Sequence, residues 1–373
     1  MASISCGGRG KICMAVLLSA AIHAPAWANT APGVLAGMHK HELLASMIPD
    51  NGDQNPYAVV IAPVSAGHIK QGDVLVDNFN ASSNLQGTGT TIMDYNPQSR
   101  QATLFAAVTA KLAGCPGGIG LTTAMTMLKS GWVIVGSLPS TDGTTKTMGA
   151  GCLIAIDATG HVAGTIAGPQ INGPWGNMAV IDKGDRATLF VSNVGFGIGA
   201  PGQKAVDQAT ILRIDLAISP GQMPEVSKQS VIGSGFSSQA DASAFIIGPT
   251  GLALGANGTL YVSDALANRV VAIDQAASRS DSAGTGRVIT QGGLLRRPLA
   301  MTLAPSGDLL VTNGLNGQVV EIDPASGTQR GAQWLDADEA QSPPGNGDLF
   351  GIVADGKSLY YVEDDVNALM VEQ

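Results

Sequence analysis

Hydrophobic and polar positions alternate in short runs along most of the chain, and residues 249–274 hold the clearest unit. Its first run is small and apolar, and the next two alternate with the two-residue period of half-buried strands. Asn257-Gly258 predicts a tight turn after the first run, because both residues tolerate positive φ. The runs are Gly251–Leu254, Leu260–Asp264, Arg269–Asp274 and Gly286–Thr290. They predict four consecutive antiparallel strands of rising exposure.

The same unit recurs along the chain at a period of roughly 50 to 70 residues, close to that of propeller repeats. Chance similarity of alternating strands does not explain six copies in the same order. The second runs of the copies are Asp73–Asn78, Trp132–Val135, Thr188–Asn193, Leu260–Asp264, Asp308–Asn313 and Ser358–Val362. We therefore predict an all-β fold, a six-bladed β-propeller of four-stranded antiparallel blades.

The sixth copy lacks an outer strand, because only two residues follow Val371. Residues 41–48, which precede the first copy, can supply this strand and close the ring without an open edge. An amphipathic helix over residues 36–48 is the alternative, and the hydrophobic pattern leaves both open.

The first 28 residues have the pattern of a secretory signal peptide. Lys11 precedes the apolar run Ile12–Ile22, and Ala26-Trp27-Ala28 is a small-x-small cleavage site. The run is too short for a membrane anchor, and no later stretch is long and apolar enough to be a transmembrane segment. We expect residues 1–28 to be removed and residues 29–373 to form a single propeller domain. The protein is then exported, either periplasmic or secreted.

Charge and composition limit the kinds of partner that we expect the protein to bind. The formal net charge is −9 and the basic residues are scattered, whereas binding to a nucleic-acid backbone depends on clustered lysine and arginine. We expect no nucleic acid among the partners, and a monomer. Neither a G-x-S-x-G elbow nor a phosphate-binding loop is present.

Two of the four cysteines, Cys6 and Cys13, belong to the signal peptide, which leaves Cys115 and Cys152. Cys115 lies just before the inner strand of the second copy, and Cys152 opens its third strand. In a propeller both positions emerge on the same face, and an exported protein meets oxidising conditions. We predict a Cys115–Cys152 disulfide, with two buried free thiols as the alternative.

The connections between second and third strands are unequal. They are long in the first three copies, at residues 79–90, 138–151 and 194–210, and short in the other three. All open on one face and are rich in Gly, Asn, Ser and Thr. They favour a small neutral polar ligand or a protein partner, and tolerated surface insertion is the alternative.

The mouth of the central channel on that face is the predicted binding site, because concavity and convergent polar groups coincide there. The polar floor would be Asn78, Asn193, Asp264, Asn313 and Asp364, and the apolar rim Phe79, Trp175 and Phe350. Converging side-chain oxygens suit a hard cation such as Ca²⁺, with Asp264 and Asp364 as the metal ligands. In the alternative interpretation, Asp and Asn at strand ends cap the next turn.

The repeat pattern P-x-G-L-A, x-N-G-x-L-Y-V-S-D, N-R-V-V-x-I-D resembles the NHL repeat. The six-copy chain resembles six-bladed NHL and gluconolactonase-like propellers. This resemblance covers most of the chain after residue 28 and is sharpest in the fourth and fifth copies. It implies a propeller fold, in a family that contains scaffolds, ligand binders and metal-dependent hydrolases.

The resemblance also implies where a lactonase would hold its divalent metal: a Glu before a Gly-Pro, an Asn-Gly, and an Asp in a Pro-Asp-Gly turn. Here the Gly-Pro pairs follow Asn172 and Ile247, and Thr250 replaces the turn Asp. Lyase members use a histidine-ligated zinc, and the histidines after residue 28 have no ligand-like spacing. We expect a ligand- or protein-binding module rather than an enzyme. The alternative is a divalent-metal-dependent, lactonase-like hydrolase with a non-standard ligand set.

Overall fold

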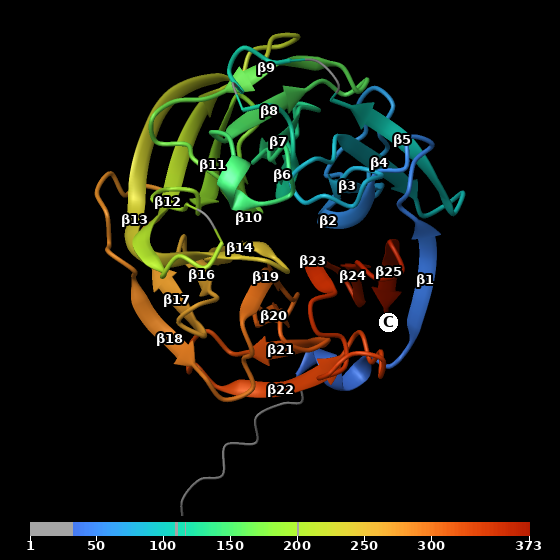
Figure 1. Cartoon of the computed structure of the whole chain (residues 1–373), viewed down its shortest axis with the longest axis vertical. Coiled ribbons are helices and arrows are strands. Elements are labelled where there is room, and N and C mark those ends of the chain that lie inside the picture. The colour runs from blue at the N-terminus through green and yellow to red at the C-terminus, as the bar shows by residue number, and fades with distance from the viewer. Residues whose placement is uncertain (1–32, 109–110, 116, 200) are drawn as a thin grey trace, which may run out of the picture. The chain divides into compact units, whose positions relative to one another are not determined.

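Six antiparallel sheets stand around a central axis in the computed structural model (Figure 1). The structure describes residues 33–108, 111–115, 117–199 and 201–373. Each sheet is a blade whose strands follow one another from the axis outward. The predicted all-β propeller with six blades is confirmed.

The first three blades follow the predicted repeat. Blade 1 contains β2 (Gln54–Ile61), β3 (Val74–Asn80), β4 (Thr91–Asn96) and β5 (Gln101–Ala107). Blade 2 contains β6 (Leu121–Met127), β7 (Val133–Ser137), β8 (Cys152–Ile156) and β9 (Val162–Ile166). Blade 3 contains β10 (Pro174–Asp182), β11 (Arg186–Asn193), β12 (Val206–Ala217) and β13 (Glu225–Asp241), and a short fifth strand, β14 (Phe245–Ile247), pairs with the end of β13.

The last three blades are more regular. Blade 4 contains β15 (Pro249–Leu254), β16 (Leu260–Asp264), β17 (Arg269–Ile273) and β18 (Arg287–Gln291). Blade 5 contains β19 (Pro298–Leu303), β20 (Leu309–Asn313), β21 (Gln318–Ile322) and β22 (Gln329–Trp334). Blade 6 contains β23 (Leu349–Asp355), β24 (Ser358–Glu363), β25 (Ala368–Glu372) and, outermost, β1 (His41–Ser46).

The N-terminal strand closes the ring. In β1, His41 lies opposite Glu372 and Ser46 lies opposite Ala368, and His41 Nδ1 is 2.8 Å from Glu372 Oε2. The predicted closing strand is confirmed, and it ends two residues before the expected Ile48. The alternative of a helix over residues 36–48 is wrong, because the one helical turn near it is the 3-10 helix η1 (Val34–Gly37).

Every inner strand changes register against its neighbour near its start, as between Pro249 and Leu252 in β15. Glycine lies in this irregular segment in β10, β15 and β23. A Cβ at Gly251 would overlap the carbonyl of Leu299 in the next blade, so the P-x-G motif lets adjacent inner strands approach closely.

Serine in the Y-V-S-D motif joins neighbouring blades. The N–H of Gly251 donates to Ser263 Oγ at 2.6 Å, and that hydroxyl donates to Leu299 O in blade 5 at 2.5 Å. Thr312 makes the same kind of link, because its hydroxyl lies 3.3 Å from Phe350 O in blade 6. These bonds satisfy backbone groups that the register changes leave unpaired.

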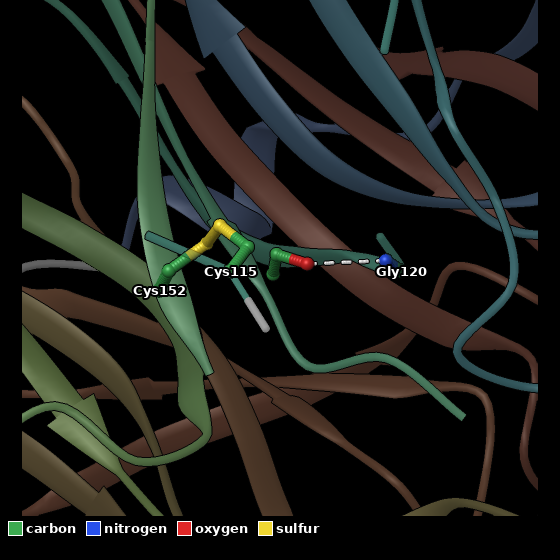
Figure 2. The surroundings of a disulfide bond; sticks show 4 residues. Cys115, Gly120 and Cys152 are labelled. Atoms are coloured by element: carbon green, nitrogen blue, oxygen red, sulfur yellow. Dashed lines mark hydrogen bonds between the residues drawn. A yellow bond between two sulfur atoms is a disulfide. The ribbon is translucent and has the colours of Figure 1, made fainter. Parts of the chain in front are cut away.

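Cys115 and Cys152 form the predicted disulfide, with their Cα atoms 5.5 Å apart (Figure 2). The bond ties the connection before β6 to the first residue of β8. The N–H of Gly120 donates to Ser137 Oγ at 3.1 Å beside it.

The predicted signal peptide and its cleavage site fall within residues 1–32, outside the described residues. Among the helices that the structure describes, none has the length and apolar character needed to cross a bilayer.

Candidate functional site

The three long connections lie on one face, called here the long-loop face, and bond to one another. Ser140 N–H donates to Gly87 O at 2.8 Å, and Thr145 Oγ1 donates to Gly199 O at 2.7 Å. Gln86 Nε2 reaches Ser243 O, in the turn before β14, at 2.8 Å. The loops therefore form a connected cover over this end of the channel.

Beneath the cover lies a cluster of five aromatic side chains, none more than 8% exposed. Ring centroids are 4.2 Å apart for Tyr57 and Phe350, 4.7 Å for Tyr57 and Phe79, and 5.5 Å for Phe79 and Trp175. Phe245, from β14, completes the group. The surrounding apolar cluster takes residues from all six blades, which places it on the axis.

The structure thus brings the predicted rim residues Phe79, Trp175 and Phe350 together, but inside the protein. The enclosed space beside them is about 10 Å³, which is no more than one water molecule needs. Sequence reasoning missed Tyr57 and Phe245. Phe245 precedes Ile246-Ile247, an apolar run that belongs to no repeat, and this run was the available signal.

Asparagine side chains of the predicted polar floor form hydrogen bonds to backbone segments. Asn78 Nδ2 donates to Met47 O at 2.9 Å. Asn193 Oδ1 accepts from Asn172 N at 3.1 Å, and Asn313 Oδ1 accepts from Arg296 N at 2.8 Å. Each side chain anchors the connection that enters its own blade, and these three bonds go to that connection and not to the turn that follows the strand.

The two predicted metal ligands have different surroundings. Asp264 is 1% exposed, and its Oδ2 lies 2.8 Å from both Nε and Nη2 of Arg269. Burial raises the pKa of Asp264, and Arg269 opposes that rise. Burial raises the pKa of Asp364 to about 7. Within the described residues, neither belongs to a group of three metal-ligating side chains whose ligand atoms lie within 4.8 Å of one another.

The opposite end of the channel is open. A cavity of about 430 Å³ lies there, lined by residues from all six inner strands. This volume is within the range of small-molecule sites. The inner strands pair on one side only, so their other edges carry backbone N–H and C=O groups toward the axis.

Asn177 sits at this cavity and bonds to two other blades. Its Nδ2 donates to Leu252 O at 2.7 Å and to Met301 O at 3.1 Å. Its Oδ1 accepts from the N–H groups of the same two residues, at 3.3 and 3.1 Å. One amide therefore satisfies four backbone groups of β15 and β19.

The rest of the lining is mixed. Thr126 and Thr302 supply hydroxyls, and Met125, Met178 and Met301 supply flexible apolar surface. Asp355 is the one ionisable residue among the described residues of the lining. The cavity thus offers hydrogen bonds and apolar contacts with little charge.

Residues at the lactonase-like positions bond or pack with neighbouring residues of the protein. Thr250 Oγ1 donates to Gly248 O at 2.9 Å, and Ile247 is part of the axial apolar cluster. Asn172 binds the Asn193 amide oxygen through its backbone N–H.

No family model matches the sequence, and no curated protein matches it. Among solved structures, the chain is similar to a gluconolactonase from Xanthomonas campestris, at 12% identity, 92% coverage of both chains and a TM-score of 0.54. It is also similar to a luciferin-regenerating enzyme, at 11% identity, with 90% of this chain and 95% of that chain covered and a TM-score of 0.54. The PQQ-bound aldose sugar dehydrogenase from Streptomyces coelicolor gives 13% identity, 89% and 97% coverage and a TM-score of 0.51.

At these identities the likeness shows the fold alone. The chain is a six-bladed β-propeller. The resemblance to gluconolactonase-like propellers, expected from the repeats, is confirmed at the level of the fold.

Proposed function

We propose that this protein is a binding propeller that takes a small neutral polar molecule into the channel mouth opposite the long-loop face. The cavity of about 430 Å³ lined by all six inner strands carries the proposal. Its strand edges and the hydroxyls of Thr126 and Thr302 suit hydroxyl or amide groups of a ligand, and its methionines adapt to apolar parts. Asp355, which is exposed, is the lining's one ionisable group in the described chain.

The proposal favours binding over hydrolysis. A lactonase-like site needs carboxylate ligands gathered on a metal, and Thr250 and Ile247 instead pack at the covered end of the axis. The gluconolactonase and the sugar dehydrogenase with this fold suggest sugars and lactones as the first compounds to test.

A thermal-shift screen of sugars, polyols and lactones on residues 29–373 tests the proposal, with calorimetry on each hit. Thr302→Phe places a bulky ring at the cavity, so the shift should disappear in this variant. Thr103→Phe makes the same change on the exposed outer strand β5 and should keep it. No shift and no heat from any compound in wild type would refute a ligand-binding cavity. Turnover of a lactone would establish the hydrolase alternative instead.

We further infer that the protein is exported. The disulfide supports this, because such bonds persist in oxidising compartments. Sequencing the N-terminus of protein from the periplasm or medium should give Asn29 as the first residue. An intact Met1 on protein that stays in the cytoplasm would contradict export.

A further inference from the structure

A second group of acidic residues lies away from the channel, where blades 5 and 6 meet. Asp336 lies near the start and Asp348 at the end of the connection between β22 and β23, and Asp365 lies in the turn between β24 and β25. One ligand atom from each of the three lies within 4.8 Å of the others. Glu363, the last residue of β24, is 8% exposed, and the charges of these aspartates act on it.

Two of these carboxylates are buried without a partner for one oxygen. Asp336 is 4% exposed and Asp348 is 7% exposed, and the Oδ2 atom of each is buried with no hydrogen bond from the described protein. Asp336 Oδ1 accepts from Asp338 N at 2.8 Å, which fixes the carboxylate on one side only. A buried carboxylate oxygen that accepts no hydrogen bond lowers the stability of the folded state. Each of the two Oδ2 atoms therefore needs a cation or a proton as its partner.

Described lysine, arginine and histidine side chains form no ion pair with this group, which comprises Asp336, Asp348, Glu363 and Asp365. Two other buried carboxylates have arginine partners: Asp264 has Arg269 at 2.8 Å, and Asp308 has Arg330 at 3.1 Å. Four clustered carboxylates without a cation repel one another strongly at low dielectric.

We propose that Asp336, Asp348 and Asp365, with Glu363 beside them, bind a divalent hard cation, and that this cation is Ca²⁺. Ca²⁺ takes six to eight oxygen ligands at about 2.3–2.6 Å, so two oxygens on opposite sides of it are about 4.6–5.2 Å apart. Oxygens that all lie within 4.8 Å of one another are close enough to share such an ion. Mg²⁺ demands near-ideal octahedral geometry, whereas Ca²⁺ accepts irregular sets of carboxylate and amide oxygens, and the side chains here come from separate segments.

The ligand set extends beyond the carboxylates. Gln341 lies beside Asp348 and has a buried side-chain oxygen without a partner. Asp365 is exposed, which leaves one side of the site open to water ligands and to entry of the ion. This site is separate from the channel cavity and from Asp264.

The bound ion would fasten two segments of the ring. Asp364 N–H donates to Asp348 O at 3.1 Å, so the 335–348 connection already touches the β24–β25 turn through the backbone. The cation adds a second link at the same place, next to the strands that close the propeller. Its removal should loosen the contact between blades 5 and 6.

Protons compete with the cation for this group, because ligand carboxylates must be deprotonated to hold a metal ion. Binding is therefore measured at pH 8.

The test uses residues 29–373, treated with chelator and dialysed, at pH 8. Calorimetry with CaCl₂ should show one binding event per chain, and Tm should rise by about 4 °C at a hundredfold excess over Kd. Asp365→Asn, at an exposed position, and Asp348→Asn should each weaken binding at least about tenfold. Asp185→Asn, an exposed carboxylate in another blade, should bind like wild type.

Two outcomes overturn the proposal. One is wild-type protein that shows neither heat nor a Tm shift at about 10 mM Ca²⁺, above the range of weak extracellular sites. The other is binding that Asp365→Asn and Asp348→Asn leave unchanged, which places the ion elsewhere. If Asp348→Asn does not fold, Asp365→Asn decides alone.

Discussion

Asp264 and Arg269 face each other across the β16–β17 turn, with two guanidinium nitrogens 2.8 Å from one carboxylate oxygen. Asp264 is almost fully buried, and the Arg269 side chain is 20% exposed. The pair gives the buried carboxylate at the end of β16 a charged partner within the protein. Asp264 therefore has two interpretations, as a partner in a structural ion pair and as a metal ligand, and mutagenesis can distinguish them.

We predict that Asp264→Ala lowers the free energy of unfolding by about 2–4 kcal/mol, because it leaves a largely buried guanidinium unpaired. Urea unfolding measures the loss. Asp274→Ala is the matched control, since its pair with Arg287 is exposed and 3.5 Å long, and it should cost less than about 1 kcal/mol. Equal, small losses in both variants would contradict the structural role. Any Ca²⁺-dependent rise in Tm should persist in Asp264→Ala.

Among the side-chain amides at the channel, Asn177 should contribute most to the free energy of unfolding. Asn177→Ala removes the partner of four backbone groups in β15 and β19, and we expect a loss of about 2–4 kcal/mol. Asn257→Ala, in an exposed turn where the side chain accepts one bond, should cost about 1 kcal/mol or less. Chemical denaturation of the two variants compares them directly. A loss in Asn177→Ala no larger than in the control would mean that water replaces the amide.

The pH dependence of the free energy of unfolding should show that Asp77 is protonated in the folded protein. Burial raises the pKa of this carboxyl to about 8, and its Oδ1 accepts the Ala58 N–H at 2.8 Å. Between about pH 4 and pH 8 the folded protein then holds a proton that the unfolded chain has lost, so stability falls as pH rises. Asp77→Asn keeps the acceptor without the titration.

The measurement is the free energy of unfolding at several pH values between 5 and 8. Asp77→Asn should gain at least about 1 kcal/mol relative to wild type over this range. Asp185→Asn, whose side chain is 74% exposed, should follow wild type. Parallel curves for wild type and Asp77→Asn would show that Asp77 is ionised when folded.

Reduction of the Cys115–Cys152 bond should destabilise blade 2. The two cysteines are 37 residues apart, and the chain-entropy estimate for a loop of that length is about 4 kcal/mol. Mass spectrometry after alkylation should find no free thiol before reduction and two after it. Cys115→Ala/Cys152→Ala should match reduced wild type in stability. Alkylation of the unreduced protein at both cysteines would disprove the bond in solution.

Much of the fold was predictable, because each blade carries its own local signals. The alternation in Leu260–Asp264 matches β16, and Gly258 has the positive φ, +80°, that the Asn-Gly turn requires. The cysteine pairing followed from the common face of two loops. The closing strand followed from a missing partner in the sixth repeat.

The candidate sites were less predictable, because they depend on segments outside the repeat or on long-range contacts. Phe245 lies in a segment with no counterpart in other blades, and it fills the mouth that the loop lengths suggested was open. Asn177 has no local partner and acts only across the axis. Asp336 and Asp348 lie near opposite ends of one connection and Asp365 lies in another turn, so no short spacing in the sequence joins them.

Pairing of β1 with β25 has a consequence for the order of folding. The residues of β1 are synthesised before those of the six inner strands, and the residues of its partner β25 are synthesised after the other strands of all six blades. Blades 1 to 5 can form from neighbouring segments while the chain lengthens, but the sixth must wait until β25 is made. Such a contact between distant segments is entropically slow to form. Completion of the ring is therefore the late, cooperative step, and a chain that stops before residue 368 would keep β1 as an unpaired strand available to other chains.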